Sequence, residues 1–424
     1  MPPPDPDAAR QFALSVVQQL REAGFQALWA GGCVRDRLMG RVPKDYDVAT
    51  AATPDQVRTV IGRRRTLAIG AVFGVVTVLG PRSAGQVEVA TFRKDATYSD
   101  GRHPDHVTFT DAQEDALRRD FTINGLFWDP VEECVIDYVD GQADLAAGIV
   151  RAIGDAHHRI AEDKLRMLRA VRFASFFGFR VDPSTLTAIA QHAAEISVVS
   201  VERISEELRR MLLHASRRKA VELLQQTGLL GEVLPELREA TARRSAAQEP
   251  LGKTFKILGA LQEPTFAASF AALIRDVAPT ADLKPARDIC RRCKLSNTET
   301  RSVLFCLEHE RLIRNALDES WADLQPVLVD PNSEELLGYV AAVVEILDSS
   351  SNAVEFCRQQ LAMPPDRLNP APLLTGDDLR AAGMPTGPAY RAVLKAVRDA
   401  QLLNQVVDRQ SALVLAKQLW ADIS

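Results

Sequence analysis

Hydrophobic and polar positions alternate in two different ways along the chain, and the change falls near residue 140. Before it, short apolar runs separated by glycine, proline and polar turns predict strands mixed with helices. The predicted strands cover residues 25–30, 45–50, 75–79 and 86–92, and the predicted helices cover 33–39 and 54–61. From residue 156 onward, apolar residues recur every three or four positions, which predicts helices almost throughout. The sequence therefore predicts an α+β protein with an N-terminal α/β part and a long all-α remainder.

Composition and charge narrow the class of protein. The chain has 424 residues, 46% hydrophobic and 25% charged, which is typical of a globular protein of about two to four domains. The net charge of −5 argues against nucleic-acid binding over the whole surface but leaves room for a local basic groove. No signal-peptide pattern is seen, and no apolar run approaches the ~18 residues of a membrane span. We therefore expect a soluble, cytoplasmic protein without a membrane contact.

Two aspartates on one predicted strand are the clearest chemical signal. Asp45 and Asp47 lie two positions apart, so both side chains leave the same face of a strand. Adjacent carboxylates repel unless a cation lies between them, and hard oxygen ligands suit Mg²⁺. Two such ions would hold the attacking and leaving oxygens of a phosphoryl displacement. Glu88, on the strand over 86–92, would add a third carboxylate if that strand pairs beside the aspartate strand.

A glycine pair precedes the aspartates at a predicted strand-to-helix turn. Gly31 and Gly32 would let the backbone approach a triphosphate, and the N-terminus of the following helix favours anions. Arg35, within one turn of that N-terminus, is placed to hold phosphate oxygens. The order of glycine pair, arginine and aspartates predicts a nucleotide-binding site in the α/β part.

Further arginines follow a polar segment over residues 94–104, whose breaker-rich composition predicts a mobile loop. Arg118 and Arg119 stand beside Asp120, and paired arginines oriented by a carboxylate are suited to gripping phosphate.

A second group of arginines lies on a helix predicted through residues 159–172. Four charged residues recur every three positions: Asp163, Arg166, Arg169 and Arg172. In one continuous helix each neighbouring pair would stay in contact, giving a winding polar ridge, while Met167, Leu168, Val171 and Ala174 pack on the opposite side. A bound nucleotide would explain this ridge, because arginine and aspartate present donors and acceptors to the edge of a base.

Together these segments resemble the class II tRNA nucleotidyltransferase and bacterial poly(A) polymerase family, within the polymerase-β type superfamily. The resemblance covers roughly residues 28–210 and lies in five stretches of sequence. They are Gly31-Gly32-Cys33-Val34-Arg35-Asp36, Asp45-Tyr46-Asp47, Arg118-Arg119-Asp120-Phe121-Thr122-Ile123-Asn124, Glu162-Asp163-Lys164-Leu165-Arg166 and Glu202-Arg203-Ile204-Ser205-Glu206-Glu207-Leu208.

The resemblance implies a fold and a role for each candidate residue. The fold would be a polymerase-β-like nucleotidyltransferase α/β head over residues 1–140, then an all-α neck (141–210), body (211–280) and tail (281–424). Asp45 and Asp47 would bind catalytic Mg²⁺, with Glu88 as a further catalytic carboxylate. The nucleotide would be bound by Gly32, Arg35, Arg119, Asp163, Arg166, Arg169 and Arg172, of which Asp163 and Arg166 would read the base.

The implied activity is addition of C, C and A to the 3′ end of tRNA from CTP and ATP, without a nucleic-acid template and with release of pyrophosphate. Poly(A) polymerase, or an enzyme adding only CC or only A, stays open as an alternative. An RNA-binding protein without catalytic activity is disfavoured, because the carboxylates are present. A dinucleotide-dependent oxidoreductase is disfavoured, because no G-x-G-x-x-G motif follows the first strand. No protein partner is indicated.

Overall fold

The computed structural model describes residues 5–95, 107–242, 251–277, 282–347, 352–387 and 389–423. The chain divides into two compact units, Met1–Pro235 and Glu236–Ser424. The first contains all the described strands and the second only helices, which confirms the predicted α+β class. The finer division into head, neck, body and tail stays a prediction. Residues 96–104 of the predicted loop lie outside the described residues. Among the helices that are described, none is long and apolar enough to cross a membrane.

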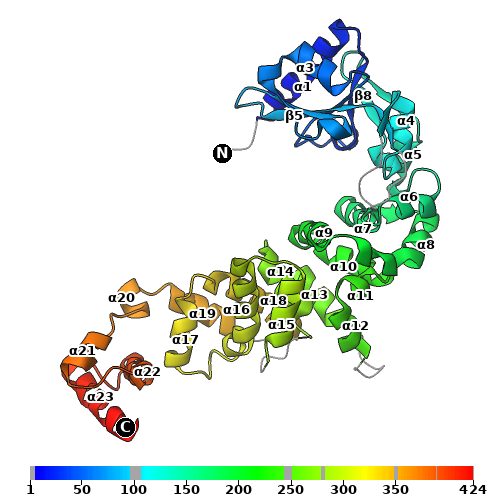
Figure 1. The fold of residues 1–424 in the computed structure, drawn as a ribbon. Coiled ribbons are helices and arrows are strands. Elements are labelled where there is room, and N and C mark those ends of the chain that lie inside the picture. The colour runs from blue at the N-terminus through cyan, green and yellow to red at the C-terminus, as the bar shows by residue number, and fades with distance from the viewer. Residues whose placement is uncertain are drawn as a thin grey trace. The chain divides into compact units, whose positions relative to one another are not determined.

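A seven-stranded mixed sheet forms the centre of the first unit, in the order β3-β4-β5-β2-β1-β8-β9. Strands β5 and β8 are labelled in Figure 1. Its strands are β1 (Ala27–Ala30), β2 (Asp47–Thr50), β3 (Thr66–Leu67), β4 (Val75–Leu79), β5 (Gln86–Thr91), β8 (Phe127–Asp129) and β9 (Cys134–Ile136). Only β2 and β5 pair in parallel among these strands. The predicted hairpin of β4 and β5 is confirmed. The predicted strand over 45–50 begins two residues later than expected, because residues 44 and 45 form a bend.

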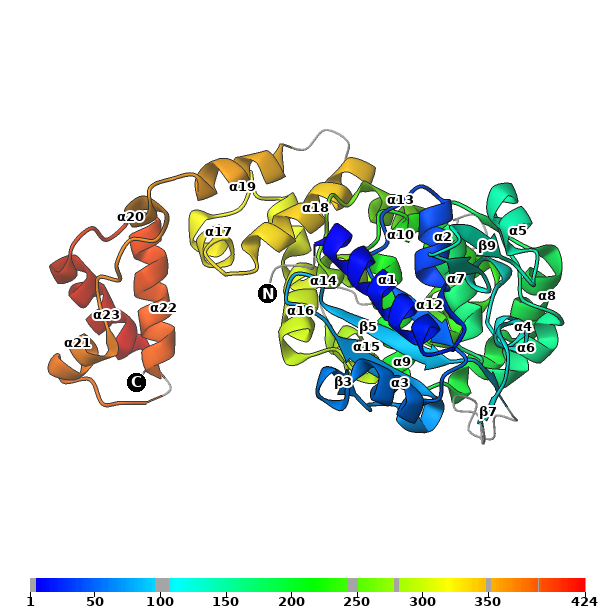
Figure 2. The same cartoon turned by 90° about the horizontal axis from the view of Figure 1, so that it is seen from above.

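The two faces of this sheet have different surroundings. Helices α1 (Pro6–Glu22) and α3 (Pro54–Ile61) cover one face, where Val48, Val76 and Val89 join the apolar core (Figure 2). As predicted, Thr53 caps α3 and Pro54 is its first helical residue. The opposite face packs Ala49 against Ala112 and Ala116 of α4 (Ala112–Leu117). Because side chains alternate along a strand, Asp47 shares this second face with Ala49.

The rest of the first unit is mostly helical. Its other helices are α2 (Gly32–Leu38), α5 (Gly141–Ala147), α6 (Ala156–Glu162), α7 (Arg166–Phe177), α8 (Pro183–His192), α9 (Val201–Leu213), α10 (Arg217–Gln226) and α11 (Leu229–Val233). Two small ladders pair β6 (Arg93–Asp95) with β7 (Val107–Phe109) and β10 (Ile149–Val150) with β11 (Arg180–Val181). Short 3-10 turns cover η1 (Arg63–Arg65), η2 (Ala71–Phe73), η3 (Thr122–Asn124) and η4 (Ala193–Val198). Met167, Leu168, Val171 and Ala174 of α7 are buried, as the sequence predicted.

The continuous helix predicted through residues 159–172 is wrong. Helix α6 ends at Glu162, and Asp163 has an extended backbone with φ −144° and ψ 107°. The Asp163 carboxylate accepts a hydrogen bond from the Leu165 amide at 3.0 Å, which competes with a helical backbone at this point. Helix α7 then begins at Arg166. Asp163 therefore precedes the arginine helix instead of lying on it.

Every described element of the second unit is a helix. They are α12 (Pro235–Ala242), α13 (Gly252–Ala260), α14 (Phe266–Ile274), α15 (Lys284–Arg292), α16 (Asn297–Arg314), α17 (Trp321–Leu328), α18 (Ser333–Leu347), α19 (Ala353–Leu361), α20 (Pro365–Leu368), α21 (Gly376–Ala381), α22 (Ala389–Leu402) and α23 (Arg409–Ile423). Inside it, the buried Glu310 carboxylate accepts from Arg275 at 2.7 Å and from the Tyr339 hydroxyl at 2.6 Å.

Candidate active site

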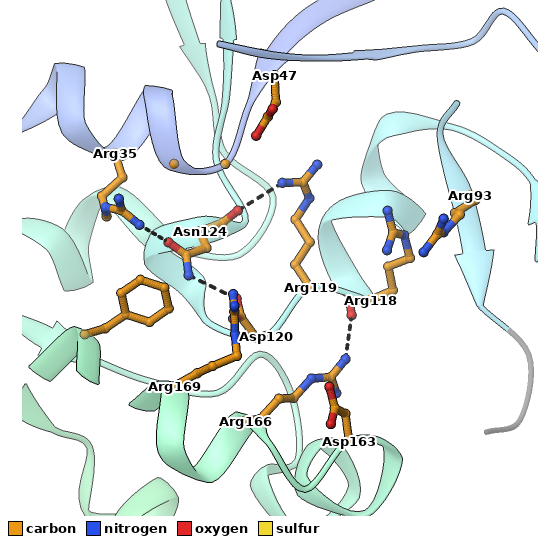
Figure 3. A pocket seen from close by; sticks show the side chains of 13 residues that line it. Arg35, Asp47, Arg93, Arg118, Arg119, Asp120, Asn124, Asp163, Arg166 and Arg169 are labelled. Atoms are coloured by element: carbon orange, nitrogen blue, oxygen red, sulfur yellow. Dashed lines mark hydrogen bonds and ion pairs between the residues drawn. The ribbon is translucent and has the colours of Figure 1, made fainter. Parts of the chain in front are cut away.

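A cavity of about 510 Å³ lies in the first unit, where the second face of the sheet meets α7 (Figure 3). It is lined by Gly31, Gly32, Arg35, Asp47, Arg93, Arg118, Arg119, Asp120, Asn124, Asp163, Arg166, Arg169 and Phe173. Six arginines against three aspartates give the wall a positive balance at neutral pH. Such a cavity suits a ligand with several negative charges, of which a nucleoside triphosphate is the common example.

The glycine pair lets charged groups approach closely. Gly31 caps α2 with φ 69° and ψ −122°, a backbone conformation essentially restricted to glycine. A Cβ atom there would lie 2.8 Å from Nη1 of Arg119, and one on Gly32 would lie 3.7 Å from Nη2 of Arg35. The backbone between β1 and α2 is therefore within reach of the two arginines that were predicted to hold phosphate.

Arg35 is held from several sides although it is buried. Its Nη1 donates to Oδ1 of Asn124 at 2.6 Å and its Nη2 to Oδ1 of Asp36 at 2.7 Å. Its guanidinium lies over the rings of Phe173 and Phe177, at 5.3 and 4.6 Å from their centroids. The sequence pattern assigned no role to Asn124. Its side chain orients Arg35, the residue that was predicted to bind phosphate.

Arg118 and Arg119 share one buried carboxylate, Asp115. Nη2 of Arg118 lies 2.7 Å from Oδ1, and Nη2 of Arg119 lies 2.9 Å from Oδ2. Burial alone would raise the pKa of Asp115, but the two guanidinium groups hold it below its ordinary value. Asp115 was not predicted, although its spacing of three and four residues from the arginines is the helical signal for such pairs.

Asp120 connects the arginine pair to helix α7. Its Oδ2 accepts from Nε of Arg169 at 2.8 Å, and its Oδ1 accepts from Nδ2 of Asn124 at 3.1 Å. Burial by itself would raise the pKa of Asp120, but Arg169 and Asn124 lower it to about 2. The predicted residue Arg169 therefore lies in the cavity and is oriented by an ionised carboxylate.

Asp163 and Arg166 lie together on the side of the cavity away from Asp47 (Figure 3). Nη1 of Arg166 donates to the Arg159 carbonyl at 2.8 Å and to Oε2 of Glu162 at 2.5 Å. Nη2 of Arg203 in α9 donates to Oδ2 of Asp163 at 2.8 Å. The structure brings these two predicted base-reading residues into one cavity through a break between helices, not through a continuous ridge.

Arg172 does not line this cavity. Its Nε lies 2.5 Å from Oε2 of Glu207 in α9, and both side chains are buried. Burial lowers the pKa of Arg172 from its ordinary value, while Glu207 acts in the opposite direction. The three-residue spacing predicted that Arg172 shares a helix face with Arg166 and Arg169, but its side chain points toward α9. Its ion pair with Glu207 joins helices α7 and α9.

Of the three predicted catalytic carboxylates, only those of Asp47 and Glu88 lie on one face of paired strands. Asp47 on β2 lies directly opposite Glu88 on β5, so the condition set for Glu88 is fulfilled and both side chains share a face. Partial desolvation raises the pKa of Asp47 to about 6, and the charge of Glu88 adds to this effect. Asp45 raises the same pKa, but it lies in the bend before β2 and lines another cavity together with Lys44 and Tyr46. The expected common strand face for both aspartates is therefore wrong.

These donors fit a divalent cation. Two opposed carboxylates make each other's ionisation more costly, and a hard cation is the group that relieves this cost. Within the described residues, no three histidine, cysteine or acidic side chains converge tightly enough to define a metal site. The fit therefore rests on Asp47 and Glu88, with Asp45 as a near neighbour.

Two further wall residues had no assigned role from the sequence: Arg93 and Phe173. Arg118 was predicted only together with Arg119, as half of a pair that grips phosphate. Arg93 begins strand β6 and donates to the Phe73 carbonyl, a long-range contact without a local sequence signal.

Comparisons with known proteins agree with this geometry. Residues 27–151 match the Poly A polymerase head domain, and residues 178–241 match the probable RNA and SrmB-binding site of polymerase A. The CCA-adding enzyme of Lactiplantibacillus plantarum is 32% identical over 97% of both chains. That of Enterococcus faecalis is 34% identical over 95% of this chain and 94% of its own.

Among solved structures, the CCA-adding enzyme of Bacillus stearothermophilus in complex with CTP has a TM-score of 0.75 and 28% identity, covering 96% of this chain and 97% of its own. The Thermotoga maritima CCA-adding enzyme complexed with tRNA, at 18% identity and a TM-score of 0.63, covers 100% of this chain and 97% of its own and shares the fold. Since relatives above 30% identity match almost the whole of both chains, this chain belongs to the family of CCA-adding enzymes.

Proposed function

We propose that this protein is a tRNA nucleotidyltransferase that adds C, C and A to the 3′ end of tRNA from CTP and ATP, without a nucleic-acid template. The observation that carries the proposal is one cavity with the carboxylate of Asp47 on one side and the Asp163–Arg166 pair on the other, separated by arginines. This arrangement offers a reaction centre, a phosphate site and a base site within one pocket. The relatives bear the name of the same activity.

Divalent metal ions, which we propose to be Mg²⁺, would be held by Asp47 and Glu88, and by Asp45 in the bend before β2. When bound, they would polarise the α-phosphate and lower the pKa of the attacking 3′-hydroxyl. The chain itself supplies the acceptor oxygens and keeps them on one face of two paired strands. The raised pKa of Asp47 supports this assignment, because it reflects a face on which an added positive charge is favourable.

The arginines of the cavity hold the triphosphate and the departing pyrophosphate. Asp115 fixes Arg118 and Arg119, and Asn124 fixes Arg35, so these donors need little reorganisation when the charge shifts to the leaving group. Their ordering is complete before the nucleotide arrives, which is the condition for electrostatic stabilisation of a transition state.

Asp163 and Arg166 select the base. An ionised aspartate accepts from the exocyclic amine that cytosine and adenine both carry, and an arginine donates to the neighbouring ring nitrogen or carbonyl. At the position of this amine, uracil and guanine carry a carbonyl oxygen, which cannot donate to Asp163. A protein template of this kind explains addition without a nucleic-acid template.

The helical parts would bind the tRNA. We keep the division into head (1–140), neck (141–210), body (211–280) and tail (281–424) as part of the proposal, supported by the match of residues 178–241 to an RNA-binding region. A cytoplasmic location belongs to the same proposal, since tRNA and both nucleotides are found there.

The decisive experiment separates CCA addition from the related activities. Purified protein is incubated with tRNA ending at the discriminator base, with CTP alone, with ATP alone and with both, and the products are sequenced. CCA addition predicts CC with CTP alone and CCA with both nucleotides. A long A tail would assign poly(A) polymerase, and a stop after CC, or A added only to tRNA ending in CC, would assign a partial enzyme. The Asp47→Asn variant controls for contaminating activity.

A further inference from the structure

A row of four side chains crosses the sheet from the proposed reaction centre to the sheet edge. The strand registers place Asp47 opposite Glu88, Glu88 opposite Thr77, and Thr77 opposite Leu67. Directly opposed residues project to the same face of a sheet. Three strand spacings of ~4.8 Å separate Asp47 from Leu67, or ~14 Å in all. The row therefore leads from Asp47 to edge strand β3, and three of its four side chains, Asp47, Glu88 and Leu67, are exposed, while Thr77 is buried.

Leu67, at the edge end of this row, is 41% exposed. By contrast, apolar strand residues on the first face are packed under α1 and α3, as the burial of Val76 and Val78 shows. An exposed leucine on the catalytic side of the sheet offers apolar contact to an unpaired base or ribose.

Three consecutive exposed arginines, Arg63–Arg65, stand directly before β3 in η1. Their side chains make no ion pair or hydrogen bond with any residue that the structure describes. Two other exposed arginines of the first unit are paired: Arg210 lies 3.0 Å from Glu206, and Arg218 lies 2.8 Å from Glu222. Single exposed arginines such as Arg10 also lack an ion pair within the described part of the chain, so the distinctive feature is a run of three consecutive positive charges in a protein with a net charge of −5.

The geometry of η1 indicates which ligand such a run suits. Successive residues of a 3-10 helix project ~120° apart, so the three guanidinium groups cannot close on a single anion. They suit a chain that carries a negative charge at each unit, and a nucleic-acid backbone is such a chain. The ~14 Å between Leu67 and Asp47 equals about four nucleotides of a stacked strand at ~3.4 Å each.

We propose that Arg63–Arg65 and Leu67 form a 3′-strand track, which binds the 3′-terminal strand of the RNA substrate and leads its terminal hydroxyl to Asp47. The track rests on the proposed function, because it assumes a 3′-hydroxyl as the attacking group. Arg63–Arg65 bind phosphates several nucleotides before the end, Leu67 packs against a base or ribose, and the strand then runs over this side of the sheet toward the exposed Glu88 and Asp47. These arginines are positioning residues and do not touch the reacting atoms.

The test compares the triple variant Arg63→Gln, Arg64→Gln, Arg65→Gln with the control Arg10→Gln. Arg10 is exposed on α1, which covers the opposite face of the sheet. For the triple variant, we expect the KM for tRNA to rise roughly tenfold while the KM for CTP stays unchanged, since phosphate contacts dominate RNA affinity. The slope of log affinity against log salt should become shallower by up to ~2, because each single-strand phosphate that is no longer neutralised accounts for ~0.7. Arg10→Gln should leave both quantities unchanged.

A second substrate locates the binding surface. An RNA minihelix containing only the acceptor stem and its unpaired 3′ end should show the same weakening with the triple variant, because the track lies within ~14 Å of Asp47. Weakening seen with tRNA but not with the minihelix would overturn the track, as would an unchanged tRNA KM and salt slope. Failure of the wild-type protein to extend tRNA would instead overturn the proposed function.

Discussion

Nη2 of Arg203 lies 2.8 Å from Oδ2 of Asp163, so a residue of α9 holds the carboxylate that follows α6. The backbone amide of Leu165 binds the other carboxylate oxygen at 3.0 Å. Together the two contacts restrict the rotation of the Asp163 carboxylate. The residue proposed to read the base is therefore a fixed hydrogen-bond acceptor before any nucleotide binds.

Asp163→Ala should relax the choice of nucleotide without abolishing the chemistry. Losing a charge-assisted hydrogen bond of this kind costs about 1.5–3 kcal/mol, or roughly ten- to a hundredfold in selectivity. The measurement is kcat/KM for all four nucleotides on tRNA ending before CCA and on tRNA ending in CC. Arg203→Ala serves as a companion variant and should give a smaller loss in the same direction. An unchanged ratio of CTP to UTP for Asp163→Ala would place specificity elsewhere.

Asp47→Ala, and equally Asp45→Ala, should abolish incorporation while tRNA binding changes little. The reason is that these carboxylates are proposed to hold the metal and not the RNA. Incorporation is measured in single turnover and tRNA binding by filter retention. A divalent cation should raise the melting temperature of the wild type but not of Asp47→Ala. Turnover within tenfold of wild type for both variants would contradict the metal assignment.

Residue chemistry could be predicted from the sequence more fully than residue placement. The strand pairing that brings Glu88 beside Asp47 was set as a condition for its role, and the structure fulfils it. The start of β2 was not predictable, because a bend at Asp45 interrupts an otherwise regular alternation. Asp163 fits the helical spacing, yet its carboxylate accepts a hydrogen bond from the Leu165 amide, and the helix is interrupted there. The spacing of residues does not show when a side chain competes with the helical hydrogen bonds of the backbone.

The position of Arg172 also could not be predicted from helical spacing. Its spacing matches the cavity arginines Arg166 and Arg169, but its partner Glu207 lies 35 residues away in the chain. A contact at that separation depends on how α7 packs against α9, which the sequence pattern of either helix alone does not show. Asp115 was not predicted either, because a single acid in a short helix is most often a solvated or capping residue.

Asp120→Asn should destabilise the protein at neutral pH by about 2 kcal/mol, since the pKa of Asp120 is about 2 against an ordinary 3.8. A depressed pKa stabilises the folded state above the unfolded pKa, and this contribution is lost as the pH falls through the folded pKa. The difference in unfolding free energy between wild type and Asp120→Asn should therefore be constant above pH ~5 and shrink between pH ~4 and ~2. Chemical denaturation across this range is the measurement. A difference that persists at the acidic end would show that the hydrogen bonds, not the charge, stabilise the fold.

Glu207→Gln should destabilise the first unit by roughly 3–5 kcal/mol, because it leaves Arg172 charged and unpaired in a buried position. Replacing both partners by leucine should recover part of this loss. Arg210→Gln on the same helix is the control, since its exposed pair with Glu206 contributes at most about 1 kcal/mol. Nucleotide selectivity of the folded Glu207→Gln enzyme should match wild type. A shift in the CTP to UTP ratio would instead bring Arg172 into the base site.

The backbone conformation of Gly31 restricts which mutations its codon can accept. With φ 69° and ψ −122°, and a Cβ atom meeting Arg119 at 2.8 Å, the position is closed to every side chain. Every amino-acid change available to a glycine codon adds a Cβ atom, so no single mutational step leads away from this residue without strain. In a saturation library selected for viability, this codon should vary only in its third base, while neighbouring surface codons drift freely.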